Sequence, residues 1–104
     1  MPVDDALHGL IGFSVRAGQL ISGQEACLAA VRTGKAALVL VDAGSSENTQ
    51  KRFRDASQYH QVTLHLMPPE AIARATGKPR MVVAMPHGAL AERARAVIQA
   101  AENA

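Results

Sequence analysis

The segment Ala36-Ala37-Leu38-Val39-Leu40-Val41 is apolar throughout and six residues long. A run of this length is typical of a strand. Because it is uninterrupted, it indicates a strand that is covered on both faces, whereas a half-exposed strand would alternate apolar and polar residues. We therefore expect this segment to be the central strand of a sheet with helices on both sides.

Helix and strand signals alternate on both sides of this segment. Asp4 and Asp5 suit the start of a first helix, and Gly18 is placed to end it. Ser22-Gly23-Gln24-Glu25 has the Ser-x-x-Glu spacing of a capping box, which predicts a second helix from about Gly23. The order α-β-α-β-α-β-α-β-α predicts an α/β fold, a three-layer α/β/α sandwich. Further along the chain, we expect a short apolar segment at 19–21, a helix end at Gly34 and a turn at 42–46. A basic helix with Thr49, Phe53 and Ala56 inward should follow, then a strand at 62–66 and a short helix from Pro68 and Pro69 that Gly77 ends. The last expected elements are a strand at 80–85 and a helix at 88–99.

Composition limits the size and the setting of this fold. The 104 residues suit one domain, and 48% hydrophobic against 3% aromatic content predicts thin aliphatic layers. The single cysteine, Cys27, cannot form an internal disulfide and is expected in a helix core, which fits a reducing cytoplasm. Since the apolar runs fall short of the roughly 20 residues that span a bilayer, we expect a cytoplasmic protein with no membrane partner.

Positive charge is concentrated in one part of the chain. The formal net charge is only +2, but between Gln50 and Arg80 six basic residues face two acidic ones, which leaves four positive charges. Arginine also outnumbers lysine by eight to three. Guanidinium groups bind phosphate and guanine edges in a fork, so this bias favours a nucleic-acid partner.

Catalytic and metal-binding patterns are not found in the sequence. Neither Gly34-Lys35 nor Gly77-Lys78 has the upstream glycine and the following Ser or Thr of a phosphate-binding P-loop. The four histidines have no ligand spacing and are expected at the surface or in structural roles. We therefore predict that the protein is not an enzyme and that it uses no metal or other cofactor.

Two short segments are candidates for binding, although each has an ordinary structural explanation. Ser22–Glu25 offers backbone N–H groups at a helix start, but a well-capped helix would look the same. Thr76–Arg80 carries two cations after a glycine, but Gly-Lys-Pro is also a common helix end. A binding function requires both segments to lie together in the fold.

The order and spacing of several motifs resemble a known family. The chain resembles the kink-turn RNA-binding ribosomal proteins of the seven-Ae and thirty-e superfamily, most closely the bacterial YlxQ-like branch, from about Leu7 to Ile98. The resemblance implies a mixed four-stranded sheet between helices, with RNA held by the start of the second helix and the loop before the last strand. The motifs are Leu10–Gly18, Ser22–Glu25, Ala30–Val41, Ser45–Thr49, and Ala75–Lys78 followed by Arg80–Ala84.

The resemblance also implies which residues bind RNA. In members that bind kink-turns the second helix begins Gly-x-Asn-Glu-x-x-Lys, so Gly23 matches the glycine and Glu25 the asparagine. Ala26 and Ala29 replace the glutamate and the lysine, and the loss of base-edge contacts worth roughly 1 to 3 kcal/mol each is expected to weaken or redirect sequence recognition. The implied RNA-binding residues are Arg16, Ser22, Gly23, Gln24, Glu25, Lys35, Gly77, Lys78 and Arg80.

These observations are compatible with three functions. The first is a non-enzymatic protein that binds structured RNA, with ribosomal RNA as one candidate and a ribosomal or other protein as a further partner. The second is a protein-interaction or scaffold domain that has lost RNA contacts, which Ala26, Ala29 and the low net charge favour. The third is a small-molecule-binding or enzymatic domain of the same fold class, which the missing catalytic residues disfavour. The sequence does not decide whether the basic helix around Lys51–Arg54 contacts RNA or only solvent.

Overall fold

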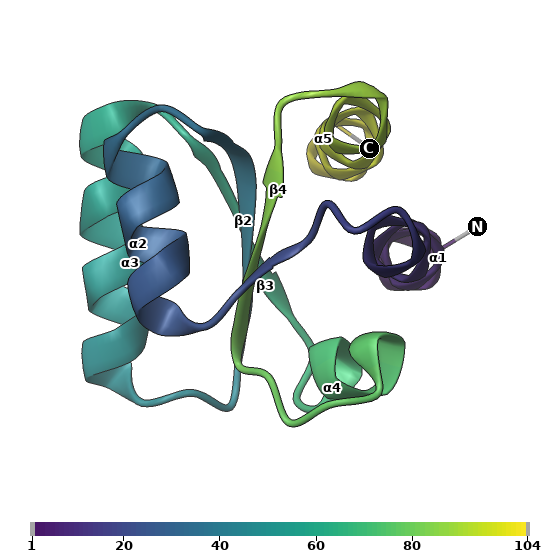
Figure 1. The fold of residues 1–104 in the computed structure, drawn as a ribbon, viewed down its shortest axis with the longest axis horizontal. Coiled ribbons are helices and arrows are strands. Elements are labelled where there is room, and N and C mark those ends of the chain that lie inside the picture. Colours follow the sequence, from purple (N-terminus) through teal and green to yellow (C-terminus); the bar gives the residue numbers. More distant parts are fainter. Residues whose placement is uncertain (1, 104) are drawn as a thin grey trace.

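A computed structural model describes residues 2–103 as a four-stranded sheet with helices on both faces (Figure 1). The predicted alternation of helices and strands is confirmed in full. In order along the chain the elements are α1 (Val3–Arg16), β1 (Ile21–Ser22), α2 (Gln24–Arg32), β2 (Ala36–Asp42), α3 (Glu47–His60), β3 (Thr63–Met67), α4 (Ala71–Thr76), β4 (Val82–Pro86) and α5 (Ala89–Glu102).

The strands lie side by side in the order β1-β4-β2-β3. β2 pairs in parallel with β3 and antiparallel with β4, which in turn pairs antiparallel with β1. Every residue of β2 is buried, as expected for a strand that lies between two others and is covered on both faces. The predicted central strand and the mixed four-stranded sheet are therefore both confirmed.

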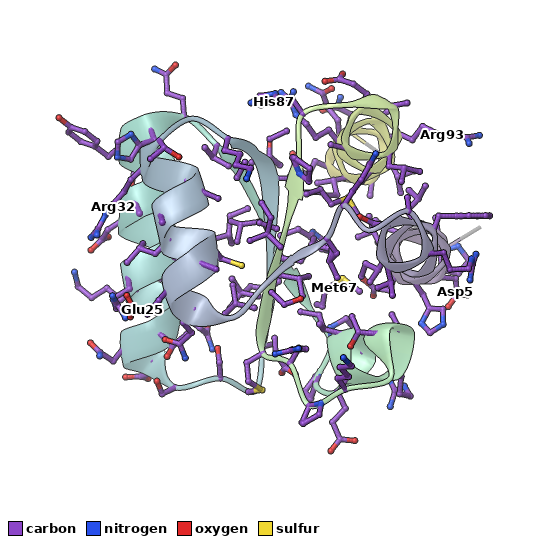
Figure 2. The ribbon with its side chains drawn as sticks, in the orientation of Figure 1. Asp5, Glu25, Arg32, Met67, His87 and Arg93 are labelled. Atoms are coloured by element: carbon purple, nitrogen blue, oxygen red, sulfur yellow. The ribbon has the colours of Figure 1, made fainter. Side chains whose placement is uncertain are left out.

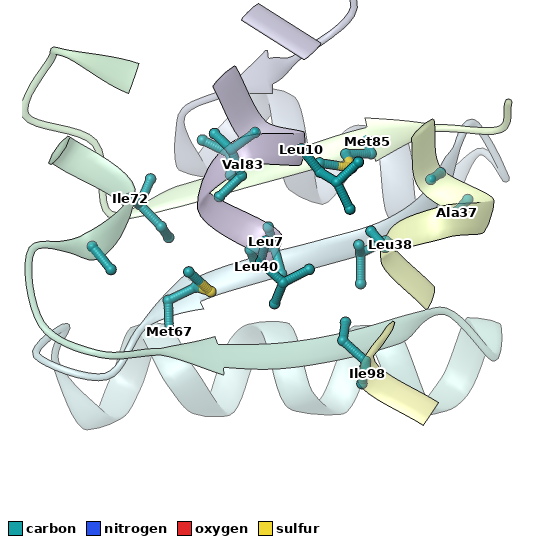
Figure 3. Close-up of a cluster of buried hydrophobic side chains, with 14 residues drawn as sticks. Leu7, Leu10, Ala37, Leu38, Leu40, Met67, Ile72, Val83, Met85 and Ile98 are labelled. Atoms are coloured by element: carbon teal, nitrogen blue, oxygen red, sulfur yellow. The ribbon is translucent and has the colours of Figure 1, made fainter. Parts of the chain in front are cut away.

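Two helical layers sandwich the sheet, as predicted. α2 and α3 cover one face, and α1, α4 and α5 cover the other (Figure 1). Side chains alternate along a strand, so Leu38 and Leu40 pack against α1 (Figure 3), while Val39 and Val41 pack on the α2 side. Each fully buried side chain of this size stabilises the fold by about 1.5–3 kcal/mol. Of the predicted inward residues, Cys27, Thr49 and Phe53 are buried and Ala56 is half-buried.

The connecting segments gather at two opposite ends of the sheet. One end, where Val41 pairs with Val82, carries the start of α2, the loop after β2, α4 and the α4–β4 loop. The other, where Ala36 pairs with Pro86, carries the turns after α2 and α3 and the β4–α5 connection. We call these the α4 end and the Lys35 end. The two ends are about 17 Å apart, the length of five residues of strand.

The predicted capping box at the start of α2 is wrong. Ser22 lies in β1, where it pairs with Val83, and the residue that precedes the helix is Gly23. Because pairing with β4 takes Ser22 into the sheet, its hydroxyl does not cap the helix and Glu25 does not face it across the first turn. Asp4 and Asp5 do not cap α1 either, since its N-cap is Pro2 and both acids lie in the first turn.

Other boundaries also differ from the sequence predictions. The segment expected at 19–21 is a strand only at Ile21, and β1 continues through Ser22. The last strand begins at Val82, because residues before it form the loop from α4, in which the Arg80 N–H donates to the Lys78 carbonyl (2.8 Å). The two prolines form a turn, and α4 starts only after Glu70, which has a left-handed φ of 68°. Within residues 2–103, no helix is long and apolar enough to cross a membrane.

Candidate functional site

The two candidate segments lie next to each other at the α4 end. β1 pairs with β4, and the Gly23 N–H donates to the Val82 carbonyl (3.1 Å) directly after the α4–β4 loop. A hollow of about 170 Å³ separates the segments, with Leu20 and Ser22 on one side and residues of the loop on the other. The structure therefore supplies the proximity that the sequence alone left open.

Gly23 gives the start of α2 its shape. Its φ of +95° is unfavourable for residues with a side chain, whereas nothing lies within 4 Å of the place where a Cβ would be. The glycine is thus required by backbone conformation and not by lack of space. It also has no side chain to cap the helix, so the first backbone N–H groups of α2 and the positive end of its dipole face outward beside Gln24 and Glu25.

Thr76 and Gly77 shape the opposite segment. The Thr76 hydroxyl donates to the Ile72 carbonyl (2.9 Å) and accepts the Lys78 N–H (3.3 Å), while Gly77 turns the chain with a φ of +75°. These bonds fix the backbone on both sides of the glycine. Lys78 and Arg80, which come next in the loop, line the small hollow together with Thr76.

A second and larger hollow of about 620 Å³ borders the same loop. Three cationic side chains line it, and two of them, Lys78 and Arg80, also line the small hollow. Arg74 of α4 is the third. The α4–β4 loop therefore borders both hollows, and its cations Lys78 and Arg80 line both.

Asp42, which also lines the larger hollow, fixes the start of α4. The residue is 3% exposed, and its carboxylate accepts the N–H groups of Gly44 (2.6 Å) and Glu70 (3.0 Å). Charge-assisted bonds of this kind compensate for the burial of a carboxylate. The bond to Glu70 holds the start of α4 against the end of β2. The sequence patterns indicated only a turn at Asp42.

The predicted binding residues separate into three groups. Arg16 ends α1 beside Val15, which lines the small hollow, but its guanidinium lies over the Phe13 ring, 4.7 Å from the centroid. Lys35 lies at the opposite end of the sheet, the Lys35 end, apart from the other predicted binding residues. The residues that the structure brings together at the α4 end are Ser22, Gly23, Gln24, Glu25, Gly77, Lys78 and Arg80.

Arg52 of α3 is a neighbour that the sequence patterns did not assign to the site. Its Nη1 and Nη2 atoms each lie 3.4 Å from Oε1 of Glu25, 27 residues earlier in the chain. The positive charge of the segment around Lys51–Arg54 is visible in the sequence, but its contact with the start of α2 depends on how the two helices pack.

The buried Cys27 thiol of α2 is not suited to nucleophilic catalysis. Burial raises the pKa of the Cys27 thiol to about 12, and its Sγ donates to the Ile21 carbonyl at 3.5 Å. A thiol with such a pKa stays protonated at neutral pH and is a poor nucleophile. Across the same described residues, no three His, Cys, Asp or Glu side chains are grouped so that they could hold a metal ion.

The sequence matches known proteins over most of its length. Residues 5–89 match the ribosomal protein L7Ae/L30e/S12e/Gadd45 family. The RNA-binding protein YlxQ of Enterococcus faecium is 38% identical over 91 residues, which cover 86% of this chain and 88% of that protein. The RNA-binding protein YlxQ of Bacillus subtilis (strain 168) is 32% identical over 75 residues, which cover 71% of this chain and 75% of that protein.

Solved structures share the fold. A protein of unknown function from Bacillus halodurans C superposes with a TM-score of 0.82 at 26% identity, covering 88% of this chain and 95% of that one. A 15.5kD RNA binding protein from Giardia lamblia superposes with a TM-score of 0.79 at 20% identity, and the match covers 97% of this chain and 88% of that one. The second likeness, at that identity, shows the fold alone.

Proposed function

The chain belongs to the ribosomal protein L7Ae/L30e/S12e/Gadd45 family, and on that premise we propose that it is an RNA-binding domain whose RNA surface is the α4 end. The surface consists of the start of α2 and the α4–β4 loop. Its proposed action is non-catalytic binding of a structured RNA in the cytoplasm. Two relatives that are at least 32% identical have RNA-binding names, which supports this proposal.

One observation carries the proposal: Lys78 and Arg80 lie on a loop that borders two hollows, beside the outward N–H groups of α2. Side-chain cations and helix N-termini both bind phosphate oxygens. Sequence-specific RNA recognition mostly targets unstacked bases of loops and bulges, and arginine planes such as those of Arg74 and Arg80 at the larger hollow are among the groups on which such bases stack. The combination suits a bent or internally looped RNA better than a regular duplex.

Kink-turn recognition is the finer form of this proposal. Ala26 and Ala29 are exposed on α2, so methyl groups occupy the surface where longer polar side chains would reach base edges. We therefore propose recognition mainly through backbone shape and phosphates, with ribosomal RNA as the first candidate ligand. Lys35 is left out of the proposed surface because of its place at the Lys35 end.

Fluorescence anisotropy with a kink-turn RNA and a plain duplex of equal length, at two salt concentrations, tests the proposal. We expect preference for the kinked RNA and an affinity that falls with salt, with a slope near the number of phosphates neutralised. Gly23→Val should reduce the preference, because valine disfavours a φ of +95°.

Three results would count against parts of this proposal. Equal binding to both RNAs would remove kink-turn recognition and leave general RNA binding. Binding that does not depend on salt would remove the phosphate contacts. Failure to bind either RNA, together with protein partners that survive nuclease treatment of a lysate, would favour a protein-interaction domain.

A further inference from the structure

The contact between Glu25 and Arg52 joins two helices at the edge of the proposed RNA surface. Glu25 is the second residue of α2, and Figure 2 places it on the side of the helices that faces away from the sheet. Arg52 lies on α3 next to the buried Phe53. The Glu25 side chain is 84% exposed and that of Arg52 is 39% exposed, so both groups are open to a ligand.

The ion pair between Glu25 and Arg52 is weak, so a ligand can replace one of its partners. Both N···O distances are 3.4 Å, longer than the 2.7–2.9 Å typical of a strong charge-assisted bond, and exposed pairs of this kind contribute little to stability. Lys51, the preceding residue, is held more closely, with its Nζ 2.6 Å from the Asp55 carboxylate one turn further along α3. Of these two cations, Arg52 therefore forms the weaker ion pair.

The position of the pair also matters for a polyanionic ligand. An unpaired carboxylate beside the start of α2 would repel RNA phosphates, and Arg52 offsets that charge. A phosphate, in turn, can accept two guanidinium N–H groups in a fork and so replaces the single Glu25 oxygen as their acceptor.

We propose that Arg52 extends the RNA surface from the start of α2 onto α3, and that an RNA phosphate displaces Glu25 from its guanidinium. Glu25 is then an internal competitor that lowers RNA affinity, and Arg52 is a phosphate contact. This inference rests on the proposed function of the α4 end.

Arg54 provides a matched control on the same helix. It is exposed, carries the same charge, and comes two positions after Arg52, which places it roughly 200° further around α3. Loss of net charge alone would affect both positions equally, whereas a phosphate contact at Arg52 would not.

Anisotropy titrations of four variants with a kink-turn RNA at several salt concentrations test the proposal. Arg52→Gln should weaken binding about tenfold and reduce the salt slope by about 1, as expected for one lost phosphate contact. Arg52→Lys should keep the slope and lose part of the affinity, because the charge remains while the fork is lost. Arg54→Gln should leave the slope unchanged. Glu25→Gln should strengthen binding by about twofold to fivefold, the range of a weak exposed pair.

The outcomes separate this inference from the function on which it rests. Equal effects of Arg52→Gln and Arg54→Gln, with wild-type binding intact, would overturn the inference and leave the proposed function standing. Weaker binding by Glu25→Gln would overturn the competitor role, because it would make the carboxylate a contact. Wild-type protein that binds no RNA would overturn the proposed function itself. Thermal unfolding of each variant shows whether a lost affinity reflects lost folding.

Discussion

The chain contains the triplet Thr-Gly-Lys twice, once at each end of the sheet. In both copies the threonine hydroxyl donates to the carbonyl four residues earlier at 2.9 Å, and the glycine has a left-handed φ, 78° at Gly34 and 75° at Gly77. Both are therefore helix ends with nearly identical local geometry. Their lysines, Lys35 and Lys78, nevertheless lie in different surroundings.

The two lysines lead into different segments of the chain. Lys35 leads directly into the buried strand β2, at the end where Figure 2 labels His87. The Nε2 of His87 donates to the Gly34 carbonyl at this end (3.1 Å). Lys78 leads into an open loop with Arg80, beside the start of α2 and two hollows. The same residues thus make an ordinary turn at one end and a candidate RNA surface at the other, and tertiary position decides between them.

Removal of cations at the two ends of the sheet should give the largest difference in RNA affinity. Replacing Lys78 and Arg80 together with glutamine should weaken RNA binding about 100-fold and reduce the salt slope by about 2, since two phosphate contacts are lost. Lys35→Gln should change affinity by less than about twofold, because a cation outside the surface makes no such contact. Anisotropy titrations measure both; similar losses at the two ends would remove the distinction.

Alanine at the two glycines should give equal losses of stability. Gly34→Ala and Gly77→Ala should each lower the free energy of unfolding by about 1 kcal/mol, because alanine disfavours a left-handed φ. Denaturant unfolding measures this cost, and Gly9→Ala, in the middle of α1, should be neutral or stabilising. Only Gly77→Ala should also weaken RNA binding. An RNA defect in Gly34→Ala would contradict the account.

Valine at the two threonines should give a smaller difference, which lies in the loss of stability. Thr76→Val should cost about 1 kcal/mol of stability, since the Lys78 N–H loses its acceptor along with the bond to Ile72. Thr33, whose hydroxyl has the Ala29 carbonyl as its one hydrogen-bond partner among residues 2–103, should tolerate valine within about 0.5 kcal/mol. Thermal unfolding of the two variants gives the difference, and equal values would mean that Thr76 does not brace the loop.

The sequence predicted the fold more completely than the site. Apolar runs and turn residues are local patterns, so β2 and the alternation of helices and strands were predicted correctly. The capping box failed because its spacing is local, whereas the pairing of Ser22 with Val83 joins residues far apart in the chain. The family resemblance grouped Lys35 with the other cations, but the sheet topology shows that Lys35 precedes β2 at the opposite end of the sheet.

The contacts that position the site were harder to foresee. The carboxylate of Asp42 reaches Glu70 across 28 residues, and Arg52 reaches Glu25 across 27. Neither pair has a sequence spacing that predicts contact. Asp42 at the end of an apolar strand was a usable signal for a fixed turn, but its acceptor role toward α4 requires the tertiary structure.

A titration of isotopically labelled protein with unlabelled kink-turn RNA, monitored by backbone amide NMR shifts, tests the central claim most directly. An RNA surface at the α4 end predicts the largest changes at residues 22–26 and 76–81, smaller ones along the first half of α3, and none beyond noise at 33–35, 60–62 and 86–88. Changes concentrated at the Lys35 end, with the α4 end unaffected, would contradict it.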